Sequence, residues 1–396
     1  MKKTSLFDCD AVPIEVLKQR AFNFRRAETA ADVIPLTAAD PDFRCAPEIS
    51  QAIAEYALEG VFSYGPHQGL DSFKHALSEG LAHRKDYRLN PELILPIDSV
   101  ASAMYVVAKT YLNPGDEAII FDPVDFLFEQ AVLAAGAQVK RCRFNAKDGQ
   151  FDLASLDELI NERTKLIGVC NPHNPLGRLM TEQELSTLAH LAKQHNLMIL
   201  NDEIWSDIVY PEHTMHSFHH LEPALMEHVI TVYGFSKSFA LAGLRVGAIF
   251  APSEHHYQQL VTSSNVMTTA GGVSTLSQIA ATAAVLHCWY WVDEFLIHLT
   301  HMRDYAVARL NAMPGVHCTS PQATYLLFPD ISATGLSSET LTEELLKDKL
   351  AVVPGSPRFF GPAAQGHIRI CFATSETLLR QGLDRMETTL HRLGVQ

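Results

Sequence analysis

From about residue 93, the chain alternates short apolar runs with longer segments in which apolar residues recur every three or four positions. The apolar runs lie at 93–97, 116–123, 165–172, 196–203, 229–234 and 245–252, and the helical periodicity lies at 99–112, 126–137 and 181–195. Thr181 and Glu184 have the spacing of a capping box that begins the last of these helices. The alternation predicts βαβ units, and strands so continuously apolar are typical of a parallel sheet covered by helices on both faces.

After about residue 285 this rhythm changes. One long helical segment at 289–313 precedes an apolar run at 324–329, a short helix near 337–349 and a second apolar run at 367–373. The 396 residues exceed the length at which one core usually stops growing. We therefore expect an α/β protein with two domains: a large domain of mostly parallel sheet over residues 51–285, and a smaller α+β domain formed by residues 1–50 and 286–396.

Composition and charge restrict the partners. The formal net charge of −14 opposes binding to a phosphate backbone, so nucleic acid is not an expected partner. We find no apolar, uncharged run of about 18 residues, the length that a membrane span needs, and no signal-like N-terminus, so no membrane partner is expected and the predicted location is the cytoplasm. The seven cysteines are dispersed and form no CxxC pair, which indicates a reducing compartment. The histidines of "HTMHSFHH" lack cysteine or carboxylate partners at ligand spacing, so no metal site is predicted.

Chemically informative side chains follow several of the apolar runs. In parallel sheets, ligands bind beyond the carboxyl ends of the strands, and Asn174, Asp202 and Lys237 come just after three such runs. Lys237 lies in the apolar stretch "YGFSKSFALAGLRVG", where desolvation favours the neutral amine, a nucleophile toward carbonyl carbon. Taken alone it also fits a surface lysine. Asp202 fits either a turn cap or the counter-ion of a buried cation, such as a protonated pyridine nitrogen.

Other residues suit the binding of anions. Ser99 begins a predicted helix of small residues, whose free backbone amides can hold a phosphate. Arg245 is a permanently charged fork, and Arg369 lies inside an apolar run, where it needs either a bound anion or a structural carboxylate partner. Asn174 can donate an amide hydrogen bond to a phenolate oxygen or form a turn between its prolines. Together these groups are what a pyridoxal phosphate site requires.

The stretch from Gly234 to Gly247, with Ser236, Lys237 and Arg245, resembles the cofactor-attachment signature of the class I and II aminotransferases, which are pyridoxal phosphate enzymes of fold type I. The segments "NPHNPLGR", "NDEIWSD" and "GHIRICFA" follow in the order and spacing of that family, and the likeness covers nearly the whole chain. Within the superfamily, "ADPDF" and "DEIWSDIVY" with His216 downstream resemble the cystathionine β-lyase-like branch of C–S lyases.

The resemblance implies a role for each matching position. Lys237 would form the internal aldimine and later move the substrate α-proton, Asp202 would pair with the pyridinium, and Asn174 would bind the phenolic oxygen. The phosphate would be held by Ser99, Val100 and Arg245. The other implied cofactor contacts are Ala101, Phe126, Trp205 and Ser236. Arg369 would bind the substrate α-carboxylate, with Ala39 and Asn174 beside it. Tyr64 matches a tyrosine that reaches the cofactor phosphate of the neighbouring subunit, which implies a homodimer.

Three positions depart from the pattern. Asp125 stands where relatives usually have a stacking tyrosine, with Phe126 next to it. Trp205 replaces a tyrosine or histidine, and Gly234 replaces a serine.

The sequence thus predicts a pyridoxal phosphate-dependent aminotransferase that acts on an L-amino acid through a Lys237 aldimine and a quinonoid carbanion. The first alternative is a C–S β-lyase that releases a thiol, ammonia and pyruvate. The second is a non-catalytic homologue that binds a ligand.

Overall fold

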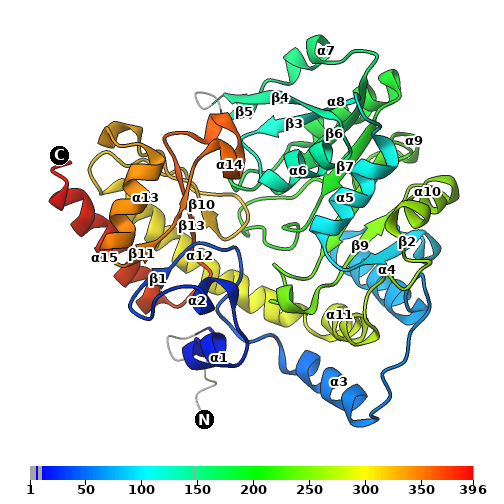
Figure 1. Ribbon diagram of the computed structural model, residues 1–396, viewed down its shortest axis with the longest axis horizontal. Coiled ribbons are helices and arrows are strands. Elements are labelled where there is room, and N and C mark those ends of the chain that lie inside the picture. Colours follow the sequence, from blue (N-terminus) through cyan, green and yellow to red (C-terminus); the bar gives the residue numbers. More distant parts are fainter. Residues whose placement is uncertain (1–5, 8–10, 146–148, 396) are drawn as a thin grey trace.

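A sheet of eight strands organises the middle of the chain (Figure 1). The computed structural model describes residues 6–7, 11–145 and 149–395. The strand order is β2 (Ile94–Ile97), β9 (Gly247–Phe250), β8 (Val229–Gly234), β7 (Met198–Asp202), β6 (Thr164–Cys170), β3 (Glu117–Asp122), β4 (Gln138–Asn145) and β5 (Gln150–Phe151). The strands from β4 to β8 in this order are parallel, whereas β9 is antiparallel to both β8 and β2, and β5 is antiparallel to β4.

Helices cover both faces of this sheet, as the apolar runs predict. Ala118 and Ile120 of β3 belong to the core under α5 (Val100–Tyr111), α6 (Phe126–Ala134) and α10 (Glu254–Ser264). The alternate residues Ile119 and Phe121 belong to the core on the opposite face, under α8 (Glu182–His195). Near β8 and β9, that opposite face packs against α4 (Asp71–Lys85) and α11 (Thr275–His287). Because successive side chains of a strand point to opposite faces, a fully apolar strand needs both layers.

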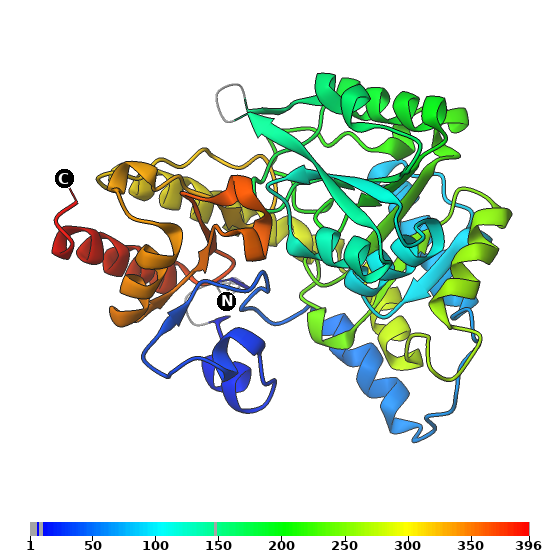
Figure 2. The same ribbon diagram turned by 45° about the horizontal axis from the view of Figure 1, so that its top comes forward.

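Residues from the two ends of the chain build two further, smaller sheets (Figure 2). In one, β1 (Ile34–Pro35) pairs in parallel with β11 (Leu350–Ala351). In the other, β13 (Ile368–Cys371) lies between β10 (Leu326–Leu327) and β12 (Val353–Pro354), antiparallel to both. The associated helices are α12 (Trp289–Asn311), α13 (Ser338–Lys347), α14 (Pro357–Phe360) and α15 (Glu376–Arg392). The N-terminal segment therefore pairs with the C-terminal part of the chain, while the domain limits 51 and 285 stay predictions.

The remaining helices are short or peripheral: α1 (Ile14–Gln19), α2 (Phe24–Ala27), α3 (Pro47–Leu58), α7 (Leu156–Leu159) and α9 (Pro223–Met226). None of the helices in the described ranges is long and apolar enough to cross a bilayer. The same ranges contain no group of three or more histidine, cysteine or acidic side chains placed to hold a metal ion.

Two features of the sheet differ from the sequence expectation. The runs at 93–97 and 245–252 form the antiparallel strands β2 and β9, because an apolar run shows burial on both faces but not strand direction. The strand β4 was not predicted. Its residues alternate between exposed and partly buried positions near the sheet edge, so its sequence is largely polar. The capping box of α8 is confirmed: Thr181 Oγ1 accepts from the amide of Glu184, whose carboxylate accepts from the amide of Thr181.

Candidate active site

A cavity of about 660 Å³ lies at the carboxyl ends of the central parallel strands, closed on the other side by residues of the N- and C-terminal parts of the chain. All but one of the predicted site residues line it: Ala39, Ser99, Val100, Ala101, Phe126, Asn174, Asp202, Trp205, Ser236, Lys237, Arg245 and Arg369. The strands β6, β7 and β8 bring Asn174, Asp202 and Lys237 to this edge because they are parallel and adjacent.

Lys237 follows β8 and reaches across to the N-terminal segment. Its Nζ donates a hydrogen bond of 2.6 Å to the carbonyl oxygen of Ala39 and lies 5.5 Å from the centre of the Trp205 ring. Burial lowers the pKa of Lys237 below its ordinary value, an effect that the carboxylate of Asp40 opposes. A lysine in this state is closer to the neutral, nucleophilic amine than a surface lysine is.

Asp202 is the last residue of β7 and is 4 % exposed. Its Oδ1 accepts a hydrogen bond of 3.0 Å from the amide of Ile204, and the thiol of Cys170 lies 3.9 Å from Oδ2. Burial raises the pKa of this carboxyl from 3.8 to about 7. No basic side chain of the described residues forms an ion pair with it. Asp202 is therefore a buried carboxyl group that a cationic ligand nitrogen in the cavity would stabilise in its ionised form.

The N-terminus of α5 faces the same cavity. Ser99 caps this 12-residue helix, accepting a hydrogen bond of 3.0 Å from the amide of Ser102. Ser99, Val100 and Ala101 line the cavity at the positive end of the helix dipole, and Ser236 and Arg245 line it too. Arg245 is exposed, with its backbone in the left-handed region at φ 52°. A helix end of this length with an unpaired guanidinium nearby suits an anion such as a phosphate.

Arg369 lies on β13 and is connected to Asp125 through the amide of Asn174. Arg369 Nη1 donates to Asn174 Oδ1 at 3.3 Å, and Asn174 Nδ2 donates to Asp125 Oδ2 at 2.8 Å. Arg369 Nη2 donates to the carbonyl of Thr37 at 3.1 Å, while its buried Nε has no hydrogen-bond partner among the described residues. The guanidinium thus keeps an unused donor, which suits a carboxylate ligand.

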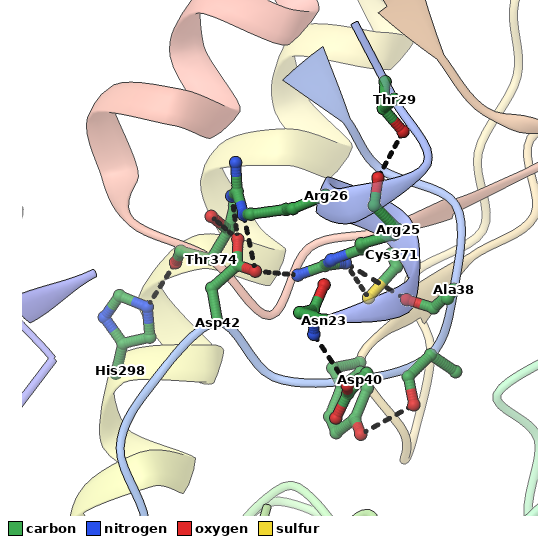
Figure 3. Close-up of polar contacts among 12 residues, drawn as sticks. Asn23, Arg25, Arg26, Thr29, Ala38, Asp40, Asp42, His298, Cys371 and Thr374 are labelled. Atoms are coloured by element: carbon green, nitrogen blue, oxygen red, sulfur yellow. Dashed lines mark hydrogen bonds and ion pairs between the residues drawn. The ribbon is translucent and has the colours of Figure 1, made fainter. Parts of the chain in front are cut away.

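The N-terminal segment that accepts the Lys237 hydrogen bond is clamped by a buried ionic cluster (Figure 3). Asp42 forms ion pairs with both Arg25 and Arg26 and accepts a hydrogen bond of 2.6 Å from Thr374. Arg25 also donates to the carbonyl of Ala38 at 3.1 Å. Breaking a buried pair of this kind is costly, so the cluster fixes the wall of the cavity beside Lys237.

Two of the departures from the family pattern have a clear structural setting. Trp205 is 1 % exposed and packs edge-on against Tyr325, with ring centres 4.6 Å apart. A Cβ atom on Gly234 would lie 2.8 Å from Cγ2 of Val100. The valine at the start of α5 therefore needs a glycine opposite it.

The structure separates Tyr64 from the other predicted site residues. Tyr64 is 91 % exposed and lines a different hollow, together with Phe62 and residues 266–276. The single chain therefore does not bring this tyrosine to the cavity.

Sequence reasoning missed several residues of the cavity wall. Phe24, Val353 and Phe360 line the cavity, as does Asp125, which the sequence comparison marked only as a departure. Asp125 had a usable signal, because it caps α6 directly after a buried strand. The other three had none, because their strands and helices are only two to four residues long.

The comparisons with known proteins give a consistent result. The sequence model of the family described as "Aminotransferase class I and II" matches residues 31–386. The aspartate aminotransferase of Pyrococcus abyssi is 32% identical over 368 residues, which cover 91% of this chain and 92% of the relative. The cystathionine beta-lyase PatB of Bacillus subtilis is 30% identical over 91% of this chain and 93% of its own. The solved structure of the aromatic aminotransferase of Pyrococcus horikoshii OT3 is similar with a TM-score of 0.86 and 29% identity, covering 93% of this chain and 98% of the other.

Proposed function

Because the chain belongs to the class I and II aminotransferases, we propose that it transfers the amino group of an L-amino acid to a 2-oxo acid. The observation that carries this proposal is the convergence of Lys237, Asp202 and Arg369 on one cavity, although they come from distant parts of the sequence. The three side chains supply an amine, a buried carboxyl group and a fork for a carboxylate.

The family depends on pyridoxal phosphate, and the cavity residues fit this group. Asp202 is a buried carboxyl without a cationic partner among the described side chains, and the pyridine nitrogen is such a cation. The N-terminus of α5, with Ser99 and the guanidinium of Arg245, suits the phosphate. Bound there, the cofactor supplies an electron sink for negative charge on the substrate α-carbon.

The residues of this chain divide the remaining work. Lys237 attaches the cofactor aldehyde through Nζ and, once displaced, moves a proton to and from the substrate α-carbon. Asn174 holds Arg369 through its Oδ1, and its Nδ2 has a second hydrogen besides the one donated to Asp125. That hydrogen is free for the phenolic oxygen. Arg369 orients the substrate through its α-carboxylate, and Val100, Ala101, Phe126, Trp205 and Ser236 complete the cofactor pocket.

A C–S β-lyase is the second candidate, and the likeness to the cystathionine beta-lyase of Bacillus subtilis favours it. Both reactions share every step up to removal of the α-proton. They differ in the fate of the electron pair: it returns with a proton to the cofactor in transamination, whereas it expels a thiolate from the β-carbon in elimination.

We also propose that the protein acts as a homodimer. Tyr64 lies outside the cavity on an exposed, partly apolar segment with Val61 and Phe62. A second copy that covered this segment would bury it and bring Tyr64 to the partner's phosphate site.

Incubation of the purified protein with two sets of reagents tests these proposals. An amino donor with 2-oxoglutarate yields a new amino acid only in transamination, whereas cystathionine without an acceptor yields pyruvate only in elimination. The variant Lys237→Ala should lose both activities and the visible absorbance of the bound cofactor. A protein that gives neither product with a broad amino-acid panel would contradict both candidates and leave a ligand-binding role.

A further inference from the structure

Only three basic side chains line the cavity among the described residues: Lys237, Arg245 and Arg369. Under the proposed function, the first attaches to the cofactor, the second faces its phosphate and the third binds the substrate α-carboxylate. No further lysine, arginine or histidine of the described chain lies on the cavity wall to receive a second carboxylate of a substrate.

The surroundings of Arg369 are apolar on the sides that a substrate side chain would meet. Val353 of β12 is its direct cross-strand neighbour. The guanidinium carbon lies 5.1 Å from the centre of the Phe360 ring. Phe24 and Phe359 line the cavity as well, from α2 and α14. A group held by Arg369 is thus bordered by aliphatic and aromatic surfaces.

The acidic side chains of the wall add a second argument. Asp98, Asp125 and Asp202 line the cavity, so they balance the three basic groups in number. Asp125 also lies one amide away from Arg369, through the two hydrogen bonds of Asn174. A carboxylate on the substrate side chain would add negative charge to a site whose cations are already committed, and charge left unpaired in a low-dielectric cavity is costly.

Resting on the proposed function, we infer that the preferred substrate is a monocarboxylic L-amino acid with an apolar side chain, and that aspartate and glutamate are poor substrates. The chain thereby differs in substrate class from the aspartate aminotransferases to which it is similar. The apolar wall of Phe24, Val353, Phe359 and Phe360 is the surface that selects the side chain.

One nearby cation provides a strong challenge to this inference. Arg358 precedes Phe359 in α14 and is exposed, with its guanidinium carbon 5.3 Å from the centre of the Phe359 ring. It does not line the cavity. If Arg358, or a residue of a second copy, did receive a side-chain carboxylate, dicarboxylates would bind at least as well as monocarboxylates.

Binding of unreactive acids tests the inference without relying on turnover. Titration calorimetry on the cofactor-loaded protein would compare 3-phenylpropanoate with glutarate, which differ in whether the far end is a ring or a carboxylate. We expect 3-phenylpropanoate to bind about tenfold or more tightly, the scale on which apolar pockets discriminate. Equal or tighter binding of glutarate would overturn the inference.

Two matched variants locate the selecting wall. Phe24→Arg places a cation on the wall at an exposed residue (65 % exposed), so it should not disturb the core and should move the binding ratio about tenfold toward glutarate. Phe22→Arg adds the same charge on a neighbouring residue (73 % exposed) that does not line the cavity, and it should leave the ratio unchanged. An identical ratio in both variants would overturn the assignment of this wall to the side chain.

The reaction itself separates failure of the inference from failure of the proposed function. Spectral half-reactions with L-phenylalanine and L-leucine should be faster than those with L-aspartate and L-glutamate. Faster reaction with aspartate would refute the substrate class while supporting an aminotransferase. No spectral change with any amino acid would refute the proposed function, and the order of binding of the two acids would still decide the inference.

Discussion

Replacing Asp202 with asparagine should stabilise the cofactor-free protein, and increasingly so as the pH rises. The pKa of this carboxyl is raised by burial from 3.8 to about 7, so between these pH values the folded state holds a proton that the unfolded state has lost. Stability from such a group is present at low pH and is lost as the pH rises through the folded pKa. Each pH unit in this range corresponds to about 1.36 kcal/mol, so raising the pH from 5 to 7 costs the wild type about 2.7 kcal/mol. Asparagine, which does not ionise, avoids this cost.

Urea unfolding of cofactor-free wild type and Asp202→Asn at pH 5, 6, 7 and 8 measures the effect. The free energy of unfolding of the variant relative to wild type should grow by about 2–3 kcal/mol from pH 5 to pH 8. Asp42→Asn is the matched control. Burial opposes the ionisation of Asp42, but Arg25 and Arg26 hold its pKa below the ordinary value. Removing that charge should destabilise the protein by about 3–5 kcal/mol, and by the same amount at every pH in this range. A pH-independent effect of Asp202→Asn would refute the reasoning.

The stabilising substitution should cost function. Once a pyridinium nitrogen lies next to Asp202, the ionised carboxylate gains a partner that asparagine does not provide. We therefore expect Asp202→Asn to bind pyridoxal phosphate more weakly than wild type at pH 8, a loss measurable by equilibrium dialysis. Stabilising changes at active sites often have this consequence.

Three further predictions concern the rest of the site. Gly234→Ser should lower the free energy of unfolding by about 1–3 kcal/mol, because its Cβ meets Val100 at 2.8 Å; urea unfolding should show that adding Val100→Ala restores most of the loss. Arg369→Lys should raise the KM for the amino substrate by roughly tenfold, because a lysine cannot bind the α-carboxylate through two parallel hydrogen bonds; an unchanged KM in steady-state kinetics would contradict the role of Arg369. Tyr64→Phe should increase the dissociation constant of the cofactor in the dimer, while the same change at the exposed Tyr105, which lies outside the cavity, should not; gel filtration with cofactor titration checks both.

Local sequence patterns determined the elements of this fold. The apolar runs became buried strands, and the helical periodicity became α5, α6, α8, α12 and α13 close to the predicted limits. The capping box of Thr181 and Glu184 was legible because both partners lie within one helical turn. The family motif around Lys237 was legible for the same reason: its signal is contained in one short stretch of the chain.

The antiparallel strand β9 and the polar strand β4 could not be read in this way. Strand direction and position in a sheet depend on which strand is the neighbour, and that is a contact between distant residues. The cavity wall has the same origin. Val353 and Phe360 belong to elements of two and four residues, too short for any periodicity to show.

The sequence by itself therefore determined which side chains carry the chemistry, since lysine, aspartate and arginine are recognisable by type and by their place after apolar runs. Only the tertiary structure decided what each of them faces. Lys237 reaches a carbonyl oxygen 198 positions away, and Arg369 reaches an amide 195 positions away. Contacts of that separation arise from how strands and domains pack, which no local pattern encodes. The charge balance and the apolar wall that choose the substrate follow from those contacts.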